Sequence, residues 1–175
     1  MTRALGLDLS CTSTGVALPT GRTLALRPQA SLSVAARLHW IAGAIARIAH
    51  IYEPDVAVLE GYSLHSPGVL STIRLAEVGG AVRLMLHERS VPYMEITPAQ
   101  LKRYATGNGA APKDRMVAAA FAAGGEPGNH DQADAWLLRA LAIHGLDGED
   151  LLAGSQPDRR KTRLEVVASI DWSPR

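Results

Sequence analysis

Short runs of apolar residues open the chain and predict three consecutive strands. The runs lie at residues 4–9, 14–18 and 23–27. A tight turn around Ser13 and Gly15 joins the first two, because small residues and glycine favour a sharp change of chain direction. Three strands with such short connections predict an antiparallel meander.

After these strands, segments with the apolar spacing of a helix alternate with segments typical of a strand. Apolar residues recur every three or four positions over residues 33–52, which predicts a long helix, and a second long helix fits residues 69–89. Between them, residues 55–60 contain an unbroken apolar run, as is typical of a central parallel strand that is buried on both faces. Residues 91–96 predict a further strand, and Thr97-Pro98 supplies a helix cap followed by a first-turn proline.

The last third of the chain is mainly helical in pattern. Two more helices are predicted at about 112–123 and 130–144. Together the elements predict an α/β domain over residues 1–146, with a mixed five-stranded sheet flanked by helices. Residues 147–175 form a C-terminal extension of unclear role, in which the segment LEVVASI, residues 164–170, predicts an edge strand or a tail that packs late.

The composition narrows the class of protein. The 175 residues are 47% hydrophobic and 20% charged, which is typical of one globular domain. The single Cys11 excludes an internal disulfide framework and a cysteine-based zinc cluster. No apolar run reaches the roughly 20 residues that a membrane span needs, and Met1 leads directly into a strand, so we expect a cytoplasmic protein without a membrane partner.

Arginine dominates the basic residues. Of 18 basic residues, 15 are Arg, and only Lys102, Lys113 and Lys161 are Lys. The planar guanidinium group suits phosphate recognition, although a compositional bias of the genome would produce the same ratio.

Four carboxylates fall at matching places in this predicted fold. Asp8 lies in the first strand, Glu60 ends the strand after the first long helix, and Asp131 and Asp134 lie three apart in the last helix. Residues three apart share one helix face, and the two strands are expected to be neighbours, so the four acids predict one cluster at one end of the sheet. Such a cluster repels itself unless cations occupy it. Mg²⁺ is the expected cation, with Mn²⁺ as a substitute, and two ions can act together on a phosphodiester.

Each acid also has a simpler interpretation. Glu60 fits a solvated strand end, Asp131 fits a helix N-terminus, and Asp134 fits an exposed helix face. Asp8 is the hardest to explain in this way, because its apolar neighbours Leu7 and Leu9 place it in a buried strand, where an unpaired carboxylate is costly.

The chain resembles the RuvC-type Holliday junction resolvases of the RNase H-like nuclease superfamily. The resemblance covers roughly residues 4–145, and the stretches that carry it are GLDLSCTSTG (6–15), VAVLEGY (56–62), LAEVGGAVRLML (75–86), ITPAQLKRYATGNGAAPKDRM (96–116) and DQADAWLLRAL (131–141). It implies an RNase H-like fold and metal-dependent cleavage of four-way DNA junctions. By position, Asp8, Glu60, Asp131 and Asp134 match the catalytic acids of the family.

The resemblance also implies residues that contact DNA. Lys102 and Lys113 match basic residues that contact DNA and assist catalysis. These lysines, with their neighbours Arg103 and Arg115, flank a glycine-rich loop at residues 107–111, and we expect the two arginines to bind phosphates as well. Some relatives insert an aromatic side chain into the junction shortly after the strand-end acid. Here Tyr62 lies two positions after Glu60 and Ser63 lies three.

Two further points concern histidine and assembly. His130 directly precedes the helix acids and fits either a proton carrier or, more simply, an exposed or capping residue. Paired cuts across a two-fold junction favour a symmetric homodimer. The helix at 69–89 has more apolar positions than one buried stripe needs, and small residues at 79–81 allow close approach of another helix; the apolar positions are Leu70, Ile73, Val78, Val82 and Met85.

Three alternatives to a junction resolvase follow from the same residues. A flap or other branched-DNA endonuclease would use the same acids. A catalytically silent DNA-binding relative would not need them intact. The opening GLDLSCTSTG also resembles the first phosphate loop of actin-like ATPases and sugar kinases, but 175 residues cannot supply the second domain that closes over ATP.

Overall fold

The computed structural model describes residues 1–62, 68–173 and 175. Ser63 and His65, which follow Tyr62, lie outside these described residues. The strands are β1 (Ala4–Asp8), β2 (Thr14–Ala17), β3 (Thr23–Leu26), β4 (Val56–Glu60) and β5 (Tyr93–Ile96). The helices are α1 (Val34–Tyr52), α2 (Val69–Glu88), α3 (Pro98–Thr106), α4 (Lys113–Ala122), α5 (His130–Asp147) and α6 (Arg160–Ala168), with a short 3₁₀ turn at Pro157–Arg159.

The five strands form one mixed sheet in the order β3-β2-β1-β4-β5. The first three strands pair antiparallel, whereas β1, β4 and β5 pair parallel. This arrangement confirms the predicted meander and the predicted parallel strands. It also confirms the mixed α/β class.

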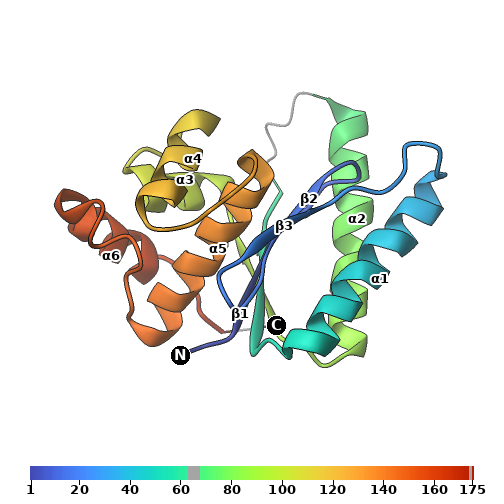
Figure 1. Ribbon diagram of the computed structural model, residues 1–175, viewed down its shortest axis with the longest axis horizontal. Helices are drawn as coiled ribbons and strands as arrows, with labels where there is room; N and C mark the ends of the chain where they lie inside the picture. The colour runs from blue at the N-terminus through green and yellow to red at the C-terminus, as the bar shows by residue number, and fades with distance from the viewer. Residues whose placement is uncertain (63–67, 174) are drawn as a thin grey trace.

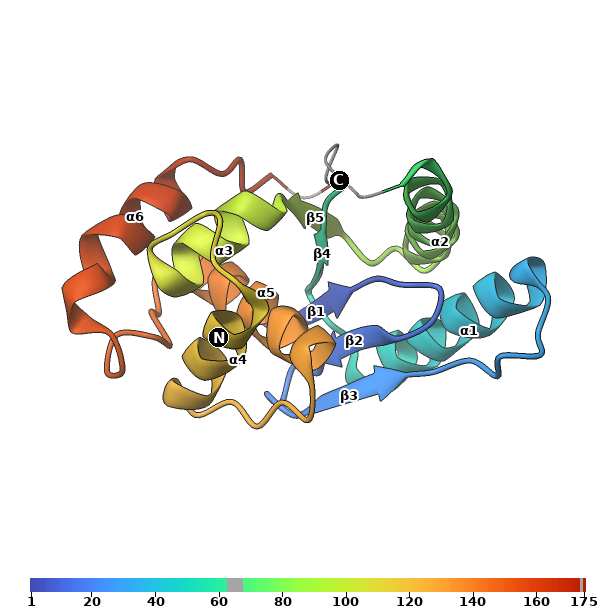
Figure 2. The ribbon, with the colours of Figure 1, turned by 90° about the horizontal axis from the view of Figure 1, so that it is seen from above.

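Helices cover both faces of the sheet (Figures 1 and 2). Helices α1 and α2 pack side by side on one face, and α5 lies on the other with α3, α4 and α6 around it. The apolar core has two parts, one on each face of the sheet, and β1 contributes side chains to both because its residues alternate between the faces. Leu5, Leu7 and Leu9 pack with α1 and α2, whereas Ala4 belongs to the core under α5. Asp8 therefore faces α5.

Local sequence sets the element ends. Ser33 accepts a hydrogen bond from the Ala36 amide and so caps α1. Thr97 and Gln100 form a reciprocal capping box at the start of α3, with Pro98 in the first turn, as predicted. Among the described residues, no helix is both long and apolar enough to cross a membrane.

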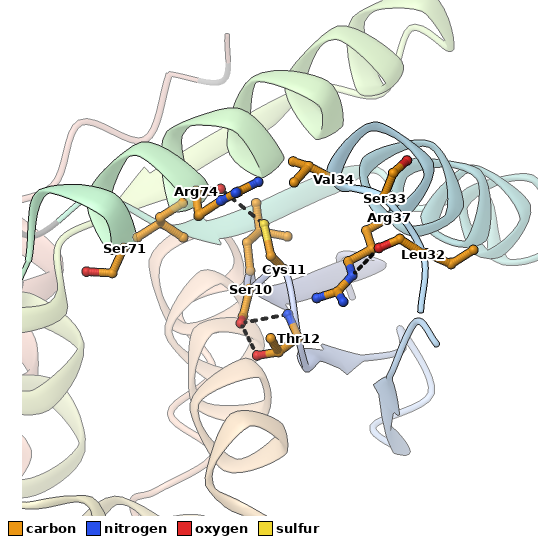
Figure 3. Close-up of a pocket in the computed structure, with 11 residues that line it drawn as sticks. Ser10, Cys11, Thr12, Leu32, Ser33, Val34, Arg37, Ser71 and Arg74 are labelled. Atoms are coloured by element: carbon orange, nitrogen blue, oxygen red, sulfur yellow. Dashed lines mark hydrogen bonds between the residues drawn. The ribbon is translucent and has the colours of Figure 1, made fainter. Parts of the chain in front are cut away.

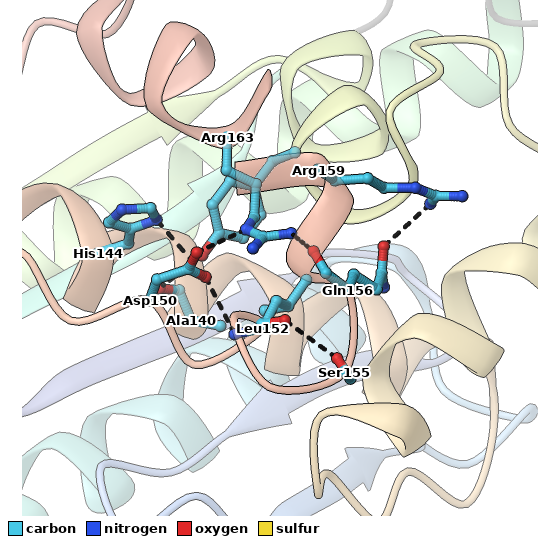
Figure 4. A network of polar contacts seen from close by, with 9 residues as sticks. Ala140, His144, Asp150, Leu152, Ser155, Gln156, Arg159 and Arg163 are labelled. Atoms are coloured by element: carbon cyan, nitrogen blue, oxygen red, sulfur yellow. Dashed lines mark hydrogen bonds and ion pairs between the residues drawn. The ribbon is translucent and has the colours of Figure 1, made fainter. Parts of the chain in front are cut away.

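The expected edge strand at 164–170 is wrong, because this segment belongs largely to α6. The helix is anchored by Arg163, which is fully buried and donates from Nε to Asp150 Oδ2 at 2.7 Å and from Nη1 to the Gln156 carbonyl at 3.0 Å (Figure 4). A buried guanidinium group needs such partners, because burial of an unpaired charge is costly. These contacts pack residues 147–170 against α3 and α5, although the chain's last residue does pair with the sheet edge at Tyr93.

Candidate active site

Two glycines let α5 approach the sheet closely enough to bring its acids to Asp8. A Cβ atom at Gly6 would stand 2.1 Å from the Ala135 carbonyl oxygen, and one at Gly15 would stand 2.0 Å from the Asp131 carbonyl oxygen. Gly15 is also the partner of Asp8 in the pairing of β1 with β2. The first turn of α5 therefore rests directly on the backbone beside Asp8.

The sheet register places Glu60 beside Asp8. Leu7 pairs with Leu59 in the parallel pairing of β1 with β4, so the next residues of the two strands are neighbours at the carboxyl ends. Neighbouring positions in a parallel pair point to the same face. Both carboxylates thus face α5, where Asp131 lies in the first turn and Asp134 lies three residues further along the helix.

The acids perturb one another strongly. Burial raises the pKa of Asp8 well above its usual range, and the charges of Glu60, Asp134 and Asp131 add to this effect. Burial, reinforced by the Glu60 charge, raises the pKa of Asp134 to about 7. Burial also raises the pKa of Glu60, although a hydrogen bond with Asp8 opposes the shift. The four predicted acids therefore form one electrostatic cluster.

Asp131 is held by two neighbours. The Ser13 hydroxyl donates to Asp131 Oδ2 at 2.6 Å, and His130 Nε2 lies 3.1 Å from Oδ1. The His130 charge also lowers the pKa of Asp134. His130 therefore lies at the cluster, while Asn129 caps the helix, so the capping role considered for His130 belongs to its neighbour.

The predicted basic residues divide into two groups. The charges of Lys102 on α3 and Lys113 at the start of α4 lower the pKa values of Glu60 and Asp134, so both lysines are near enough to act on the acids electrostatically. Arg103 instead pairs with Glu165 of α6, with 3.0 Å between Nη2 and Oε2. Arg115 is exposed on α4. Their DNA contacts stay predictions.

Tyr62 lies against α2. Its hydroxyl group is 3.4 Å from the Ala76 carbonyl oxygen and accepts a hydrogen bond from Arg83, whose guanidinium carbon is 4.8 Å from the ring centroid. The residue remains 38% exposed. In this position the ring packs over Gly79 of the same helix, and a role in the junction stays a prediction.

The hydroxyl residues after Asp8 shape the turn. Thr14 accepts from the Ser10 amide at 3.1 Å and donates to the Ser10 carbonyl at 2.8 Å, and the Thr12 amide donates to Ser10 Oγ at 3.2 Å. Ser10, Thr12 and Thr14 therefore stabilise the turn. The contact of Ser13 with Asp131 was not predicted from the sequence. No spacing rule links residues 118 positions apart, so only the serine's place in a turn next to Asp8 could have suggested it.

The cluster fits hard divalent cations by its chemistry. All four groups are carboxylates, which Mg²⁺ and Mn²⁺ prefer as ligands, and Asp134 Oδ1 is buried without a hydrogen-bond partner among the described residues. Within the described ranges, no three His, Cys, Asp or Glu side chains are gathered tightly enough to form a ready metal centre. The match therefore rests on the donor set and on the charge that the four groups share.

The sequence is similar to one family of proteins and to individual members of it. Residues 6–144 match the family described as "Crossover junction endodeoxyribonuclease RuvC". A protein of that name from Rhodospirillum rubrum is 32% identical, with 81% of this chain and 89% of the relative covered. One from Cupriavidus metallidurans is 30% identical, with 94% and 96% covered.

Solved structures show the same fold. Thermus thermophilus RuvC, solved in complex with a Holliday junction substrate, aligns with a TM-score of 0.69 and 16% identity, covering 95% of this chain and 98% of that one. The yeast mitochondrial Holliday junction resolvase Ydc2 aligns with a TM-score of 0.51 and 11% identity, covering 97% and 85%.

Proposed function

The chain belongs to the RuvC family of crossover junction endodeoxyribonucleases, and on this basis we propose that it cuts four-way DNA junctions by metal-dependent hydrolysis of paired phosphodiesters. The observation that carries the proposal is the cluster of Asp8, Glu60, Asp131 and Asp134 on one face of the sheet. A catalytically silent DNA-binding protein would have no need to maintain four self-repelling carboxylates.

The chain's own residues would divide the chemistry as follows. The four carboxylates would hold two Mg²⁺ ions, which when bound activate a water molecule and stabilise the leaving oxygen. Ser13 and His130 would orient Asp131 as positioning residues. Lys102 and Lys113 act electrostatically on the acids and would bind the phosphate oxygens, which would offset the repulsion between the DNA and the carboxylates.

The substrate preference separates junction resolution from other branched-DNA cleavage. We expect labelled four-way junctions to be cut at symmetric positions in Mg²⁺ or Mn²⁺, with no cleavage in EDTA and none of plain duplex. Mapping the cuts on junction, flap and duplex substrates measures this. Equal cleavage of flaps and junctions would favour the less selective endonuclease, and cleavage in EDTA would contradict the metal mechanism.

Lys113 is expected to contribute a phosphate contact. Lys113→Ala should weaken junction binding and reduce the slope of log K against log salt by roughly 0.9, because each lost phosphate contact releases one counterion fewer. Lys161→Ala is the matched control, since Lys161 lies on α6 and should leave the slope unchanged. An unchanged slope in Lys113→Ala would remove this residue from the interface.

We further propose a symmetric homodimer, because two active sites are needed for paired cuts. The predicted dimer surface on α2 needs correction: Val78, Val82 and Met85 pack in the core with α1 and the sheet. The same helix nevertheless exposes an apolar face made of Val69, Leu70, Ile73 and Leu84. A face of this kind is costly to leave in water.

Light scattering at micromolar concentration tests the dimer. We expect a dimer for the wild type, and a monomer for Ile73→Glu, since a charge in an apolar interface would be buried unpaired. Arg89→Glu, just beyond the end of α2, is the control. A monomeric wild type, with and without junction DNA, would contradict the proposal.

A further inference from the structure

A cavity of about 720 Å³ opens between the turn after Asp8, the start of α1 and the first half of α2 (Figure 3). Leu9, Leu32 and Leu75 contribute apolar walls, and Arg37 and Arg74 contribute positive charge. The volume lies within the range of about 300–1,000 Å³ that is usual for small-ligand pockets. Neither the four acids nor Lys102 and Lys113 are among the described residues that line it.

The turn at residues 9–13 separates the cavity from the acid cluster. Asp8 directly precedes this turn, and Ser13 at its other end holds Asp131. Ser10, Cys11 and Thr12 in between line the cavity. The cavity and the acids therefore lie on opposite sides of one short turn, so a DNA strand bound at the acids would pass close to the cavity.

The two arginines give the cavity its charge. In Figure 3, Arg74 extends from α2 towards α1, and Arg37 points from α1 towards Thr12. Arg37 Nε donates to the Leu32 carbonyl at 3.1 Å, which fixes the side chain at the rim. Arg74 makes a loose ion pair with Glu77, with 3.7 Å between Nη1 and Oε2. Both positive charges act on Cys11 at the cavity wall, where they oppose the rise in its pKa that burial causes.

We propose that this cavity binds one unpaired nucleotide of the strand that is cut, with the base against the leucines and its phosphate at Arg37 and Arg74. The inference rests on the proposed function and extends it to substrate selection. A base inside a duplex must pay a few kcal/mol to leave its stack, and the cost is least for a base that is already unpaired. The cavity would therefore favour nucleotides at a branch point.

Charge on both sides of the acids supports this path. Lys102 and Lys113 face the cluster from α3 and α4, whereas Arg37 and Arg74 lie on α1 and α2. The scissile phosphate would thus sit between two groups of cations, one on each side of the carboxylates. Such a strand would be held on both flanks of the cut.

Cys11 is a built-in reporter, because it is the only cysteine in the chain and lines the cavity. The test uses the full-length Asp8→Asn protein, which should bind DNA without cutting it, and the small neutral reagent methyl methanethiosulfonate. At a junction concentration of ten times Kd, we expect modification of Cys11 to slow by about tenfold. Duplex DNA of the same sequence should leave the rate unchanged.

A second measurement follows the base itself. A junction with 2-aminopurine next to the crossover should gain fluorescence on binding, because the described residues that line the cavity include no aromatic side chain to stack on it. Ser71→Trp should fill the cavity and remove this gain while junction binding persists. Arg74→Gln should reduce the salt slope by about 0.7, as for a single-strand phosphate contact, whereas Arg89→Gln beyond the end of α2 should not.

The outcomes separate the two proposals. If the protein neither binds nor cuts junctions, the proposed function fails. If it binds and cuts them, but the junction leaves Cys11 unprotected or Ser71→Trp leaves the fluorescence gain intact, the nucleotide cavity alone is wrong.

Discussion

Asp8→Asn is expected to reduce junction cleavage by at least about a thousandfold, because loss of a charged metal ligand removes several kcal/mol of transition-state stabilisation. Glu60→Gln should have the same effect. In both variants the amide is nearly isosteric with the carboxylate, so folding and junction binding should persist. Single-turnover cleavage and gel-shift titration measure the two properties separately.

Glu149→Gln is the matched control for these variants. Glu149 is exposed near the end of α5 and is remote in sequence from the acids, so its loss removes one negative charge without touching the cluster. It should cut like the wild type. Wild-type turnover by Asp8→Asn would contradict the assignment of Asp8 as a metal ligand. Loss of binding as well as cleavage would point to a folding defect.

The same electrostatics predict a gain in stability from a substitution that removes activity. The pKa of Asp134 is about 7 in the folded protein, against an ordinary value of 3.8. The protonated carboxyl group is therefore tolerated in the folded state below pH 3.8, whereas its ionisation progressively lowers the free energy of unfolding as the pH rises from 3.8 through 7. The amide in Asp134→Asn does not ionise, so this variant avoids that loss of stability. In EDTA at pH 8 it should melt a few degrees higher than the wild type, and the difference should narrow at pH 5.

The second large effect is expected at Gly15. A Cβ atom there would lie 2.0 Å from the Asp131 carbonyl oxygen, so Gly15→Ala must push α5 away from the sheet. We expect a loss of about 2–3 kcal/mol in the free energy of unfolding, as is usual for overpacking, together with a large fall in cleavage as Asp131 and Asp134 move from Asp8.

Gly43→Ala is the matched control for Gly15→Ala, and it is expected to stabilise the protein rather than destabilise it. Gly43 is exposed in α1, and no atom of the described residues lies within 4 Å of the position that an alanine methyl group would take there. Alanine should therefore stabilise the helix by about 0.5–1 kcal/mol and leave cleavage unchanged. Urea unfolding and initial cleavage rates compare the two variants. Full activity in Gly15→Ala would show that the close docking of α5 is not required for catalysis.

Periodic segments could be predicted from the sequence because one face of each element is buried. The strands and the long helices follow their apolar spacing, and the ends of α3 follow from its capping residues. The four acids could be placed together for the same reason, since strand order and helix phase bring them to one edge.

Features that depend on distant partners could not be predicted. The apolar run at 164–170 fits a strand or a helix equally well, and its helical state depends on the contacts of buried Arg163 with Asp150 and Gln156. On α2, the pattern does not distinguish apolar residues that face α1 from those that face solvent. The close approaches at Gly6 and Gly15 likewise depend on where α5 lies, which no local pattern records.

The contact between Ser13 and Asp131 also has a consequence for how the protein is made. The two residues are 118 positions apart, so a ribosome that adds about 5–20 residues per second needs roughly 6–24 s to pass from one to the other. Until α5 has emerged and docked, a nascent chain carries Asp8 and Glu60 but lacks half of its acids. Nuclease activity should therefore arise only after α5 has been synthesised and has docked on the sheet.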